Sequence, residues 1–421
     1  PPGPPATGED LAAVFADLDA VIAPALVHWQ HPSFFGFFPA NTSGPGVIGD
    51  LVSSGLGVNG MNWATSPAVT EVEMRMLDWF VDLLGLPPAF RHDADGPGGG
   101  VLQDSASSST LVTLLAARHR KSNGGDLSAL VVYTSAEAHS SVIKAARVAG
   151  LAPDQVRLVP IDAAFAMRPD ALAAMIADDR RRGLVPTWCC ATAGTTSSMA
   201  FDPIVEIART CADADVWCHV DAAMAGAAAV AGELRWVTDG AELVDSWSFN
   251  PHKWLFTTFD CTCLWVADRR PLVEALSITP AYLANEASQD GTVVDFRDWQ
   301  IPLGRRFRAL KPWMVMRHYG AEGLAGHIRE HVRLARLLAD RVLERADLEF
   351  AAPPALNLVC LRVVGDDAAT TALGAAINES GAALVTMTEL DGRPALRVCI
   401  GQTHTTEAHV DALWALIEAN R

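Results

Sequence analysis

Lys253 lies in surroundings that are unusual for a surface lysine. It follows the apolar run DSWSF (residues 245–249) and stands between a histidine and a tryptophan in NPHKW (residues 250–254). The simplest interpretation is a side chain that extends into solvent along its apolar stem. The alternative is a lysine partly withdrawn from water, whose amine is then nucleophilic at neutral pH and able to form a Schiff base.

Asp221 ends a second apolar run, VWCHV (residues 216–220), and precedes two alanines. A carboxylate at the end of a buried strand needs a donor or a cation to stay ionised. It either caps the next turn or pairs with a protonated pyridine nitrogen, which is the arrangement that makes a pyridoxal ring an electron sink.

Two further runs end in polar residues. SASSS (residues 105–109) follows GVLQD and begins a helical pattern, so its hydroxyls and amides either cap a helix or form an anion cup. The cup has no lysine and is therefore not a P-loop. His139, after ALVVYTS, is either structural or lies on a flat cofactor ring. An amine, a carboxylate, an anion cup and a stacking ring are together what pyridoxal phosphate requires.

The elements that must position these groups alternate along the chain. Helical patterns over residues 68–86, 109–121 and 140–150 separate seven short apolar runs, which are GVLQD, ALVVYTS, VRLVP, TWCCATA, VWCHVDA, DSWSF and CTCLWVA. This alternation predicts an α/β fold with a mostly parallel sheet and helices on both faces. Ligands bind beyond the carboxyl ends of such strands, so the polar groups are expected to meet there.

The ends of the chain differ from its middle. We predict an N-terminal segment over residues 1–43, with helical spacing from Leu11 to Ile22, and a large domain over residues 44–310. Residues 311–421 combine a long helical pattern with the runs LEFAA, LNLVCLRVV and ALRVCIG, which predicts a small α+β domain.

Composition excludes several classes of protein. The 421 residues are half apolar and carry a net charge of −17, which disfavours nucleic acid and anionic membranes as partners. The longest uncharged run of small residues, 222–232, is too short to span a bilayer, and no secretory signal is visible. The eight cysteines show no metal-binding spacing and several lie in apolar runs. We expect no metal, reduced thiols and a cytoplasmic location.

The order of the motifs resembles one family closely. FFGFFPAN, WATSPAVTEVE, SASSSTLVTLLAAR, AEAHSSVIKAARVAG, TAGTT, HVDAA, SFNPHKW and WQIPLGRRFRALK are similar to the pyridoxal-phosphate-dependent group II decarboxylases, specifically the aromatic-L-amino-acid (DOPA-type) decarboxylases. The resemblance covers nearly the whole chain from His28. It implies fold type I of pyridoxal enzymes, which is aspartate-aminotransferase-like, with a seven-stranded sheet domain and a homodimer whose active site is shared across the interface.

The resemblance also implies roles for individual residues. Lys253 would form the Schiff base with pyridoxal 5′-phosphate, Asp221 would pair with the ring nitrogen, and His139 would stack on the ring. Tyr282, in a loop from the partner subunit, would be tied to protonation of the product. The cofactor would also contact Ala106, Ser107, Thr196, Ala223, Asn250 and His252.

Family likeness favours simple decarboxylation of tryptophan, phenylalanine, tyrosine or DOPA, with a slight preference for tryptophan. The expected substrate wall consists of Trp29, Phe37, Phe38, Pro39, Met61 and Gly304. Phe37 and Ala40 replace a tyrosine and a threonine of the DOPA enzymes, so two hydroxyl partners for a catechol are missing. The alternatives are an aromatic aldehyde synthase, whose relatives tend to lack the Tyr282 or His139 counterpart, and a non-catalytic pyridoxal-binding homologue.

Overall fold

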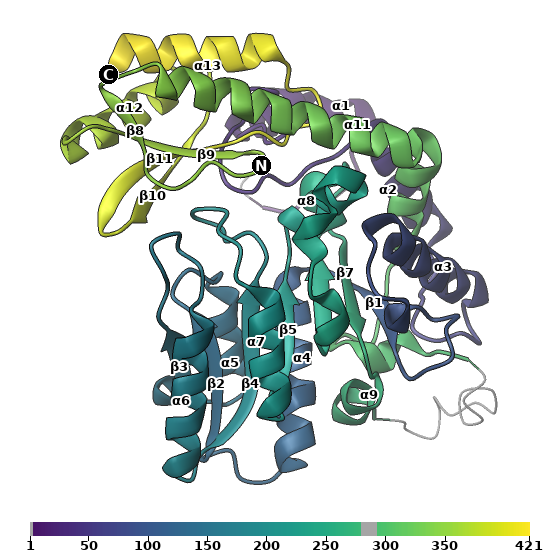
Figure 1. The fold of residues 1–421 in the computed structure, drawn as a ribbon. Helices are drawn as coiled ribbons and strands as arrows, with labels where there is room; N and C mark the ends of the chain where they lie inside the picture. The colour runs from purple at the N-terminus through teal and green to yellow at the C-terminus, as the bar shows by residue number, and fades with distance from the viewer. Residues whose placement is uncertain (1–2, 279–292) are drawn as a thin grey trace.

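The computed structural model describes residues 3–278 and 293–421 (Figure 1). Within these residues the larger sheet has seven strands, in the order β1-β7-β6-β5-β4-β2-β3. They are β1 (Gly99–Gln103), β2 (Leu130–Ser135), β3 (Val156–Val159), β4 (Val185–Thr192), β5 (Trp217–Asp221), β6 (Ser246–Phe249) and β7 (Thr262–Val266). Strands β3, β2, β4, β5 and β6 are parallel, and β7 is antiparallel to both β6 and β1. The predicted mostly parallel sheet of an α/β fold is confirmed.

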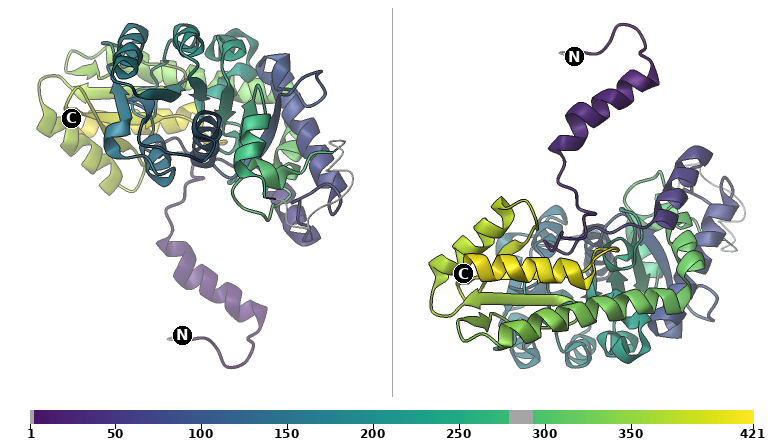
Figure 2. Two further views of the ribbon diagram at one scale, coloured as in Figure 1. Left: turned by 90° about the horizontal axis from the view of Figure 1, so that it is seen from below. Right: turned by 90° about the horizontal axis from the view of Figure 1, so that it is seen from above.

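Helices connect these strands and cover both faces of the sheet (Figures 1 and 2). The α-helices up to β7 and just after it are α2 (Gly44–Leu56), α3 (Pro67–Leu84), α4 (Ala106–Ser122), α5 (Ser141–Val148), α6 (Pro169–Arg181), α7 (Ile204–Asp213), α8 (Pro251–Trp254) and α9 (Arg270–Leu276). Short 3₁₀ turns include η5 (Ala225–Val230) and η6 (Gly232–Thr238).

Local sequence explains the ends of the main helices. Helix α3 has Pro67 at its first position, where a missing N–H costs nothing, and ends at Gly85 with a φ of 67°. Helix α4 is capped by Ser105, whose hydroxyl accepts a hydrogen bond from the Ser108 amide at 3.2 Å. Five of the seven strands are buried at every residue, as expected for a sheet covered on both faces.

A second, antiparallel sheet lies above the first in Figure 1. Its order is β10-β11-β9-β8. The elements are β8 (Leu348–Phe350), β9 (Leu358–Val363), α12 (Asp367–Glu379), β10 (Thr386–Leu390), β11 (Arg393–Cys399) and α13 (Glu407–Asn420). The sequence patterns had identified every strand except β10. This edge strand reads TMTEL, and its partly exposed, mostly polar residues lack the apolar run that marks the others.

Helix α11 (Leu310–Leu343) connects the two sheets. Its 34 residues form two helical pieces joined at Gly320, where φ is 65° and ψ is 173°. A residue with a Cβ adopts that conformation only at a cost, so the glycine accounts for the position of the kink. The first piece lies near α2, and the second packs on the small sheet.

The N-terminal helix stands away from the rest of the chain (Figure 2). It consists of α1 (Leu11–Asp17), the π-turn η1 (Leu18–Ile22) and the 3₁₀ turn η2 (Ala23–Ala25). Its apolar side chains are exposed, among them Leu11 at 70% and Phe15 at 61%. The outer face of α2 is equally apolar, with Leu51 70% exposed.

Residues 33–41 instead pack on their own chain. The Phe35 amide donates to the carbonyl of Leu384, and the Phe35 carbonyl accepts from the Cys399 amide. Phe35 is fully buried in the core of the small sheet, whereas Phe38 belongs to the core of the large one. This aromatic segment therefore joins the two cores.

All eight cysteines are free thiols in buried positions. Among the described residues, no helix combines the length and the apolar character that a membrane span requires.

Candidate active site

One cavity at the carboxyl ends of the large sheet brings together all of the residues predicted to bind a cofactor. It is lined by Ala106, Ser107, His139, Thr196, Asp221, Ala223, Asn250, His252 and Lys253, with Phe38, Ser105, Thr192 and Gly194 completing the wall. They follow strands β1, β2, β4, β5 and β6, which is why residues so distant in the chain converge.

Lys253 lies in the single turn α8, directly after β6. Withdrawal from water lowers the pKa of its amine, Arg397 lowers it further, and Asp221 opposes the shift. The amine lies 5.5 Å from the centre of the Phe38 ring. More of it is therefore neutral than in an exposed lysine, as a nucleophile at neutral pH requires.

Asp221 ends β5, between Thr192 of β4 and Ser248 of β6. Its Oδ1 accepts a hydrogen bond from the Ala223 amide at 3.0 Å. The Thr192 and Ser248 hydroxyls are buried and have no hydrogen-bond partner among the described residues. A buried hydroxyl without a partner is costly, so the free Thr192 Oγ1 on the cavity wall indicates a polar ligand there.

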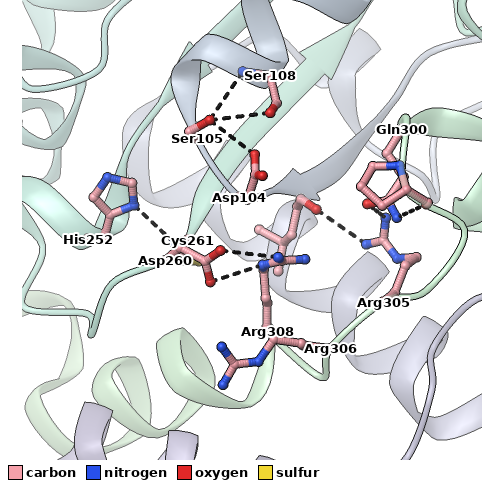
Figure 3. A network of polar contacts seen from close by, with 12 residues as sticks. Asp104, Ser105, Ser108, His252, Asp260, Cys261, Gln300, Arg305, Arg306 and Arg308 are labelled. Atoms are coloured by element: carbon pink, nitrogen blue, oxygen red, sulfur yellow. Dashed lines mark hydrogen bonds and ion pairs between the residues drawn. The ribbon is translucent and has the colours of Figure 1, made fainter. Parts of the chain in front are cut away.

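The residues predicted to form an anion cup lie at the N-terminus of α4 (Figure 3). Ser105 contacts Ser108 and Asp104 through its hydroxyl, and the Ala106 and Ser107 positions face the cavity at the start of a 17-residue helix. Asn250 completes this side, and its Oδ1 accepts from the Thr262 hydroxyl at 2.8 Å, which leaves the amide group as a donor. These donors and the helix dipole suit a phosphate group.

Two imidazoles face the cavity with their tautomers fixed. His139 Nδ1 accepts from the Ser141 amide at 3.2 Å, and His252 Nδ1 accepts from the Cys261 amide at 2.9 Å (Figure 3). Each ring therefore carries its proton on Nε2. Burial lowers the pKa of both, to about 3 for His252, where Lys253 adds to the shift. Both rings are neutral donors near neutral pH.

Arg397, on β11, belongs to the site although no sequence pattern identified it. Its Nε donates to the Thr196 carbonyl at 2.7 Å, its Nη1 donates to the Phe37 carbonyl, and its guanidinium lies 4.6 Å from the Phe38 ring centre. Burial lowers its pKa. The available signal was a charged residue within the apolar run ALRVCIG.

A second cavity meets the first at Lys253. It is lined by Trp29, Phe38, Ala40, His252, Lys253 and Phe259. Phe259 is 60% exposed, and its ring lies 4.8 Å from that of His252. Sequence reasoning missed Phe259, although an aromatic six residues after the lysine was a usable signal.

The structure brings only part of the predicted substrate wall to this cavity. Trp29 and Phe38 line it, and Phe37 stacks on Trp29 with ring centres 5.3 Å apart. Phe37, Pro39, Met61 and Gly304 are not among the residues that line either cavity. Pro39 lies against Gly401, whereas Gly304 is exposed near Asn59. Tyr282 lies outside the described residues.

The residues present fit pyridoxal phosphate. A desolvated amine, a strand-end carboxylate, a helix N-terminus and an unpartnered buried hydroxyl face one space. The described residues include no group of three or more histidine, cysteine or acidic side chains placed to hold a metal ion.

The sequence matches the model of the pyridoxal-dependent decarboxylase conserved domain over residues 1–364. It is 44% identical to phenylacetaldehyde synthase of Arabidopsis thaliana, over 99% of this chain and 87% of that protein. It is 42% identical to tryptophan decarboxylase 2 of Oryza sativa subsp. japonica, over 99% and 86%. It is 40% identical to aromatic-L-amino-acid decarboxylase of Sus scrofa, over 98% and 86%.

Solved structures agree. The crystal structure of Oryza sativa TDC with PLP and tryptamine superposes with a TM-score of 0.96 at 39% identity, covering 99% of this chain and 89% of that one. Catharanthus roseus tryptophan decarboxylase in complex with L-tryptophan gives 0.95 at 38% identity, covering 100% and 89%.

Proposed function

This chain belongs to the pyridoxal-dependent decarboxylases, and on that premise we propose that it converts an aromatic L-amino acid to the arylalkylamine and carbon dioxide. The observation that carries the proposal is the junction of the two cavities. A polar cavity suited to the cofactor and an apolar one with three aromatic walls share Phe38, His252 and Lys253. An aromatic side chain thus has a place beside the reactive amine.

Pyridoxal phosphate, when bound, supplies an aldehyde that condenses with amines and a ring that withdraws electrons from the bond to the departing carboxylate. Lys253, whose amine is partly neutral, would attach the cofactor and give it up to the substrate amine. The α4 N-terminus and Asn250 would bind the phosphate, and Asp221 would keep a proton on the ring nitrogen.

His139 and His252 act as neutral hydrogen-bond donors through Nε2. We infer that His139 lies against the cofactor ring and fixes its plane, because its flat imidazole lines the cavity together with Asp221 and Lys253. The protein's share of the work is to orient the carboxylate and exclude water. Tyr282 is proposed to deliver the proton to Cα.

The apolar cavity discriminates weakly between ring types. Among the described residues, its lining has no hydroxyl or carboxylate group, and its polar side-chain atoms are nitrogens of Trp29, His252 and Lys253. A mostly apolar site of this kind cannot strongly prefer or reject a ring hydroxyl. We therefore expect kcat/KM for tyrosine and phenylalanine to agree within about a hundredfold. Glutamate and histidine, offered as controls, should give no amine.

The sequence similarity to phenylacetaldehyde synthase makes aldehyde formation the second candidate. Incubation of the enzyme with tryptophan, phenylalanine, tyrosine or DOPA separates the two. Decarboxylation releases amine and carbon dioxide in equal amounts without consuming oxygen. Oxidative deamination consumes oxygen and releases aldehyde, ammonia, hydrogen peroxide and carbon dioxide. A cofactor-loaded protein that forms neither product would instead be a non-catalytic homologue.

The Tyr282→Phe variant tests the proton donor. Its loss should divert product from amine toward aldehyde, because the decarboxylated substrate stays unprotonated longer and oxygen competes for its electrons. Tyr319→Phe, on α11, is the matched control. An unchanged amine yield in Tyr282→Phe would remove Tyr282 from this role.

We also propose a homodimer with shared active sites. Apolar side chains on α1 and on the outer face of α2 are exposed in one chain, and burying them against a second copy would be favourable. Residues 1–43 would then lie partly on the partner, and Met61 and Gly304, which line neither of the two cavities described above, would reach the partner's cavity.

Mixing two inactive variants tests the sharing. Lys253→Ala and Gly304→Trp chains, refolded together, form hybrids in which one of two sites is intact if Gly304 serves the partner. Activity should reappear on mixing. If each site is built from one chain, the mixture stays inactive.

Eight free, buried cysteines fit a reducing compartment, and we propose that the protein is cytoplasmic. Fractionation of cells that express the tagged chain, with a secreted disulfide protein as the control, tests this assignment.

A further inference from the structure

The turn that carries Lys253 is too short to hold itself in place. Helix α8 spans only Pro251–Trp254, and no side chain caps it. A four-residue turn has almost no intrinsic stability, so its position must come from contacts of its side chains and carbonyl groups. The two chain neighbours of Lys253, His252 and Trp254, make such contacts on opposite sides of it.

The first contact runs through Asn41. The His252 carbonyl accepts a hydrogen bond from the Asn41 amide at 2.8 Å. The Asn41 side chain in turn donates through Nδ2 to the Gly401 carbonyl, just after β11. Asn41 is 1% exposed, so these bonds do not compete with solvent.

The second contact runs through His331, on the second piece of α11. Trp254 Nε1 donates to His331 Nδ1 at 2.9 Å, with the two rings within 10° of parallel. Trp254 is 0% and His331 is 1% exposed. His331 also hydrogen-bonds the backbone carbonyl of Gln402, and burial lowers its pKa to about 4. It is therefore neutral, accepting at Nδ1 and donating at Nε2.

Both contacts end on consecutive residues of the small sheet region, Gly401 and Gln402. We propose that Asn41 and His331 are positioning residues, the two arms of a clamp that fixes the Lys253 turn between the large sheet and the small one. In each turnover Lys253 must leave the cofactor and return to it, and a turn held on both sides keeps the amine within reach while its side chain moves. The link to turnover rests on the proposed function, whereas the link to the rigidity of α8 does not.

The clamp acts by geometry and not by charge. Asn41, His331 and Trp254 are all neutral, so none of them places a net charge near Lys253, and the groups that shift the pKa of its amine are others. Loss of an arm should accordingly affect the placement of the amine and the mobility of α8. A misplacement of about 1 Å at a reacting group costs about a hundredfold in rate, which sets the upper range of the effect.

The test compares three single variants. His331→Phe keeps a ring but loses both hydrogen bonds, and His331→Gln keeps one acceptor and one donor. His327→Phe makes the first substitution one helical turn earlier, where the ring packs on Phe256 at 4.8 Å and the structure gives it no hydrogen bond to α8. The readouts are kcat and KM for tryptophan, and amide hydrogen exchange in a peptide covering residues 250–256, with and without cofactor.

We expect His331→Phe to lower kcat by about tenfold or more with KM little changed, and to speed exchange in that peptide. His331→Gln should recover most of both losses, and His327→Phe should show neither. Unchanged exchange in His331→Phe would overturn the clamp, as would equal losses in the Gln and Phe variants. If the unaltered protein forms no amine but His331→Phe still speeds exchange in that peptide, the clamp stands and the proposed function is refuted.

If His331→Phe does not fold, Asn41→Ala gives the same test from the other arm. Its backbone amide still bonds His252, but the tie to Gly401 is gone. Faster exchange over residues 250–256 and a lower kcat are again expected, and an unaltered peptide would overturn the proposal.

Discussion

The two cavities that meet at Lys253 are built in different ways. The polar cavity takes most of its wall from residues at or just after the ends of five strands in one sheet, the adjacent β2, β4, β5 and β6 together with β1. The apolar cavity takes Trp29, Phe38 and Ala40 from a segment near the N-terminus and Phe259 from the loop before β7. The first is a product of sheet topology, and the second depends on how distant segments dock.

This difference explains what a change at each cavity should do. The polar side chains are held in position by the backbone of a rigid sheet. Each one makes a different contact, so no neighbour can replace it when it is removed. The apolar cavity is lined in part by the exposed Phe259. Its aromatic side chains share one role, which is to cover the ring of the substrate, so the loss of one is partly compensated by the others. Substitutions should therefore divide into large effects on turnover and smaller effects on substrate binding.

The largest effect is expected for Lys253→Ala, which removes the reactive amine at the junction of the two cavities. Turnover should fall by at least about 10³-fold, because no other amine lines the polar cavity in the part of the chain that the structure describes. Steady-state amine formation measures it, with the exposed Lys144→Ala on α5 as the control. Retained turnover would contradict the role assigned to Lys253.

Asp221→Asn should impair the polar cavity without altering the apolar one, which Asp221 does not line. A neutral amide cannot stabilise a protonated ring nitrogen as a carboxylate does, so kcat should fall about 10²- to 10³-fold while the cofactor still binds. Asp213→Asn, on α7, is the control. A fall of less than tenfold would show that the ring nitrogen does not depend on this carboxylate.

A pH experiment at Asp202 tests how rigidly the polar cavity is held, because Asp202 bonds the backbone of Thr192 in the cavity wall. Its carboxylate accepts from the Thr192 amide at 2.8 Å and the Met167 amide at 2.7 Å, and burial raises its pKa from 3.8 to about 6. The folded chain binds this proton more tightly than the unfolded chain. The stabilising contribution is therefore complete below pH 4 and is lost as the pH rises through 6, in total about 3 kcal/mol.

The unfolding free energy of Asp202→Asn, measured against the unaltered chain from pH 4 to pH 7, isolates this group. The variant has no such proton, so the difference between the two proteins should change by about 2 kcal/mol in favour of the variant between pH 4 and pH 7, which is most of the total. A difference independent of pH would show that Asp202 titrates normally.

The smallest effects belong to the apolar wall. Trp29→Ala and Phe259→Ala each remove part of the ring's surroundings, and KM for tryptophan should rise about tenfold, equivalent to about 1.4 kcal/mol, with kcat changed less. Trp236→Ala, a partly exposed tryptophan outside both cavities, is the control. A larger fall in kcat than rise in KM would mean that these rings also orient the reacting bond.

The same difference governs how far the sequence could predict the site. Strand runs followed by Asp221, Asn250 or Ser105 could be identified because alternation fixes where strand ends meet. Phe259 and Arg397 carried only weak signals, an aromatic six residues after the lysine and a charge within an apolar run, and neither signal says that the side chain lies close to the cavities. Strand β10 lacked an apolar run because it lies at an edge. For Met61 and Gly304, a single sequence does not say in which chain of an assembly a residue acts.

The buried thiols make it possible to label the protein at one chosen cysteine. All eight cysteines are free and inaccessible, and burial raises the pKa of Cys261 and Cys360 to about 12. A thiol that stays protonated and out of solvent reacts slowly with maleimides. One cysteine introduced at an exposed position of α1 or α2, such as Val14 or Leu51, would therefore accept a fluorophore in an otherwise silent background. Its emission would then report the proposed assembly with a second copy in real time, without removing a single native residue from the interior.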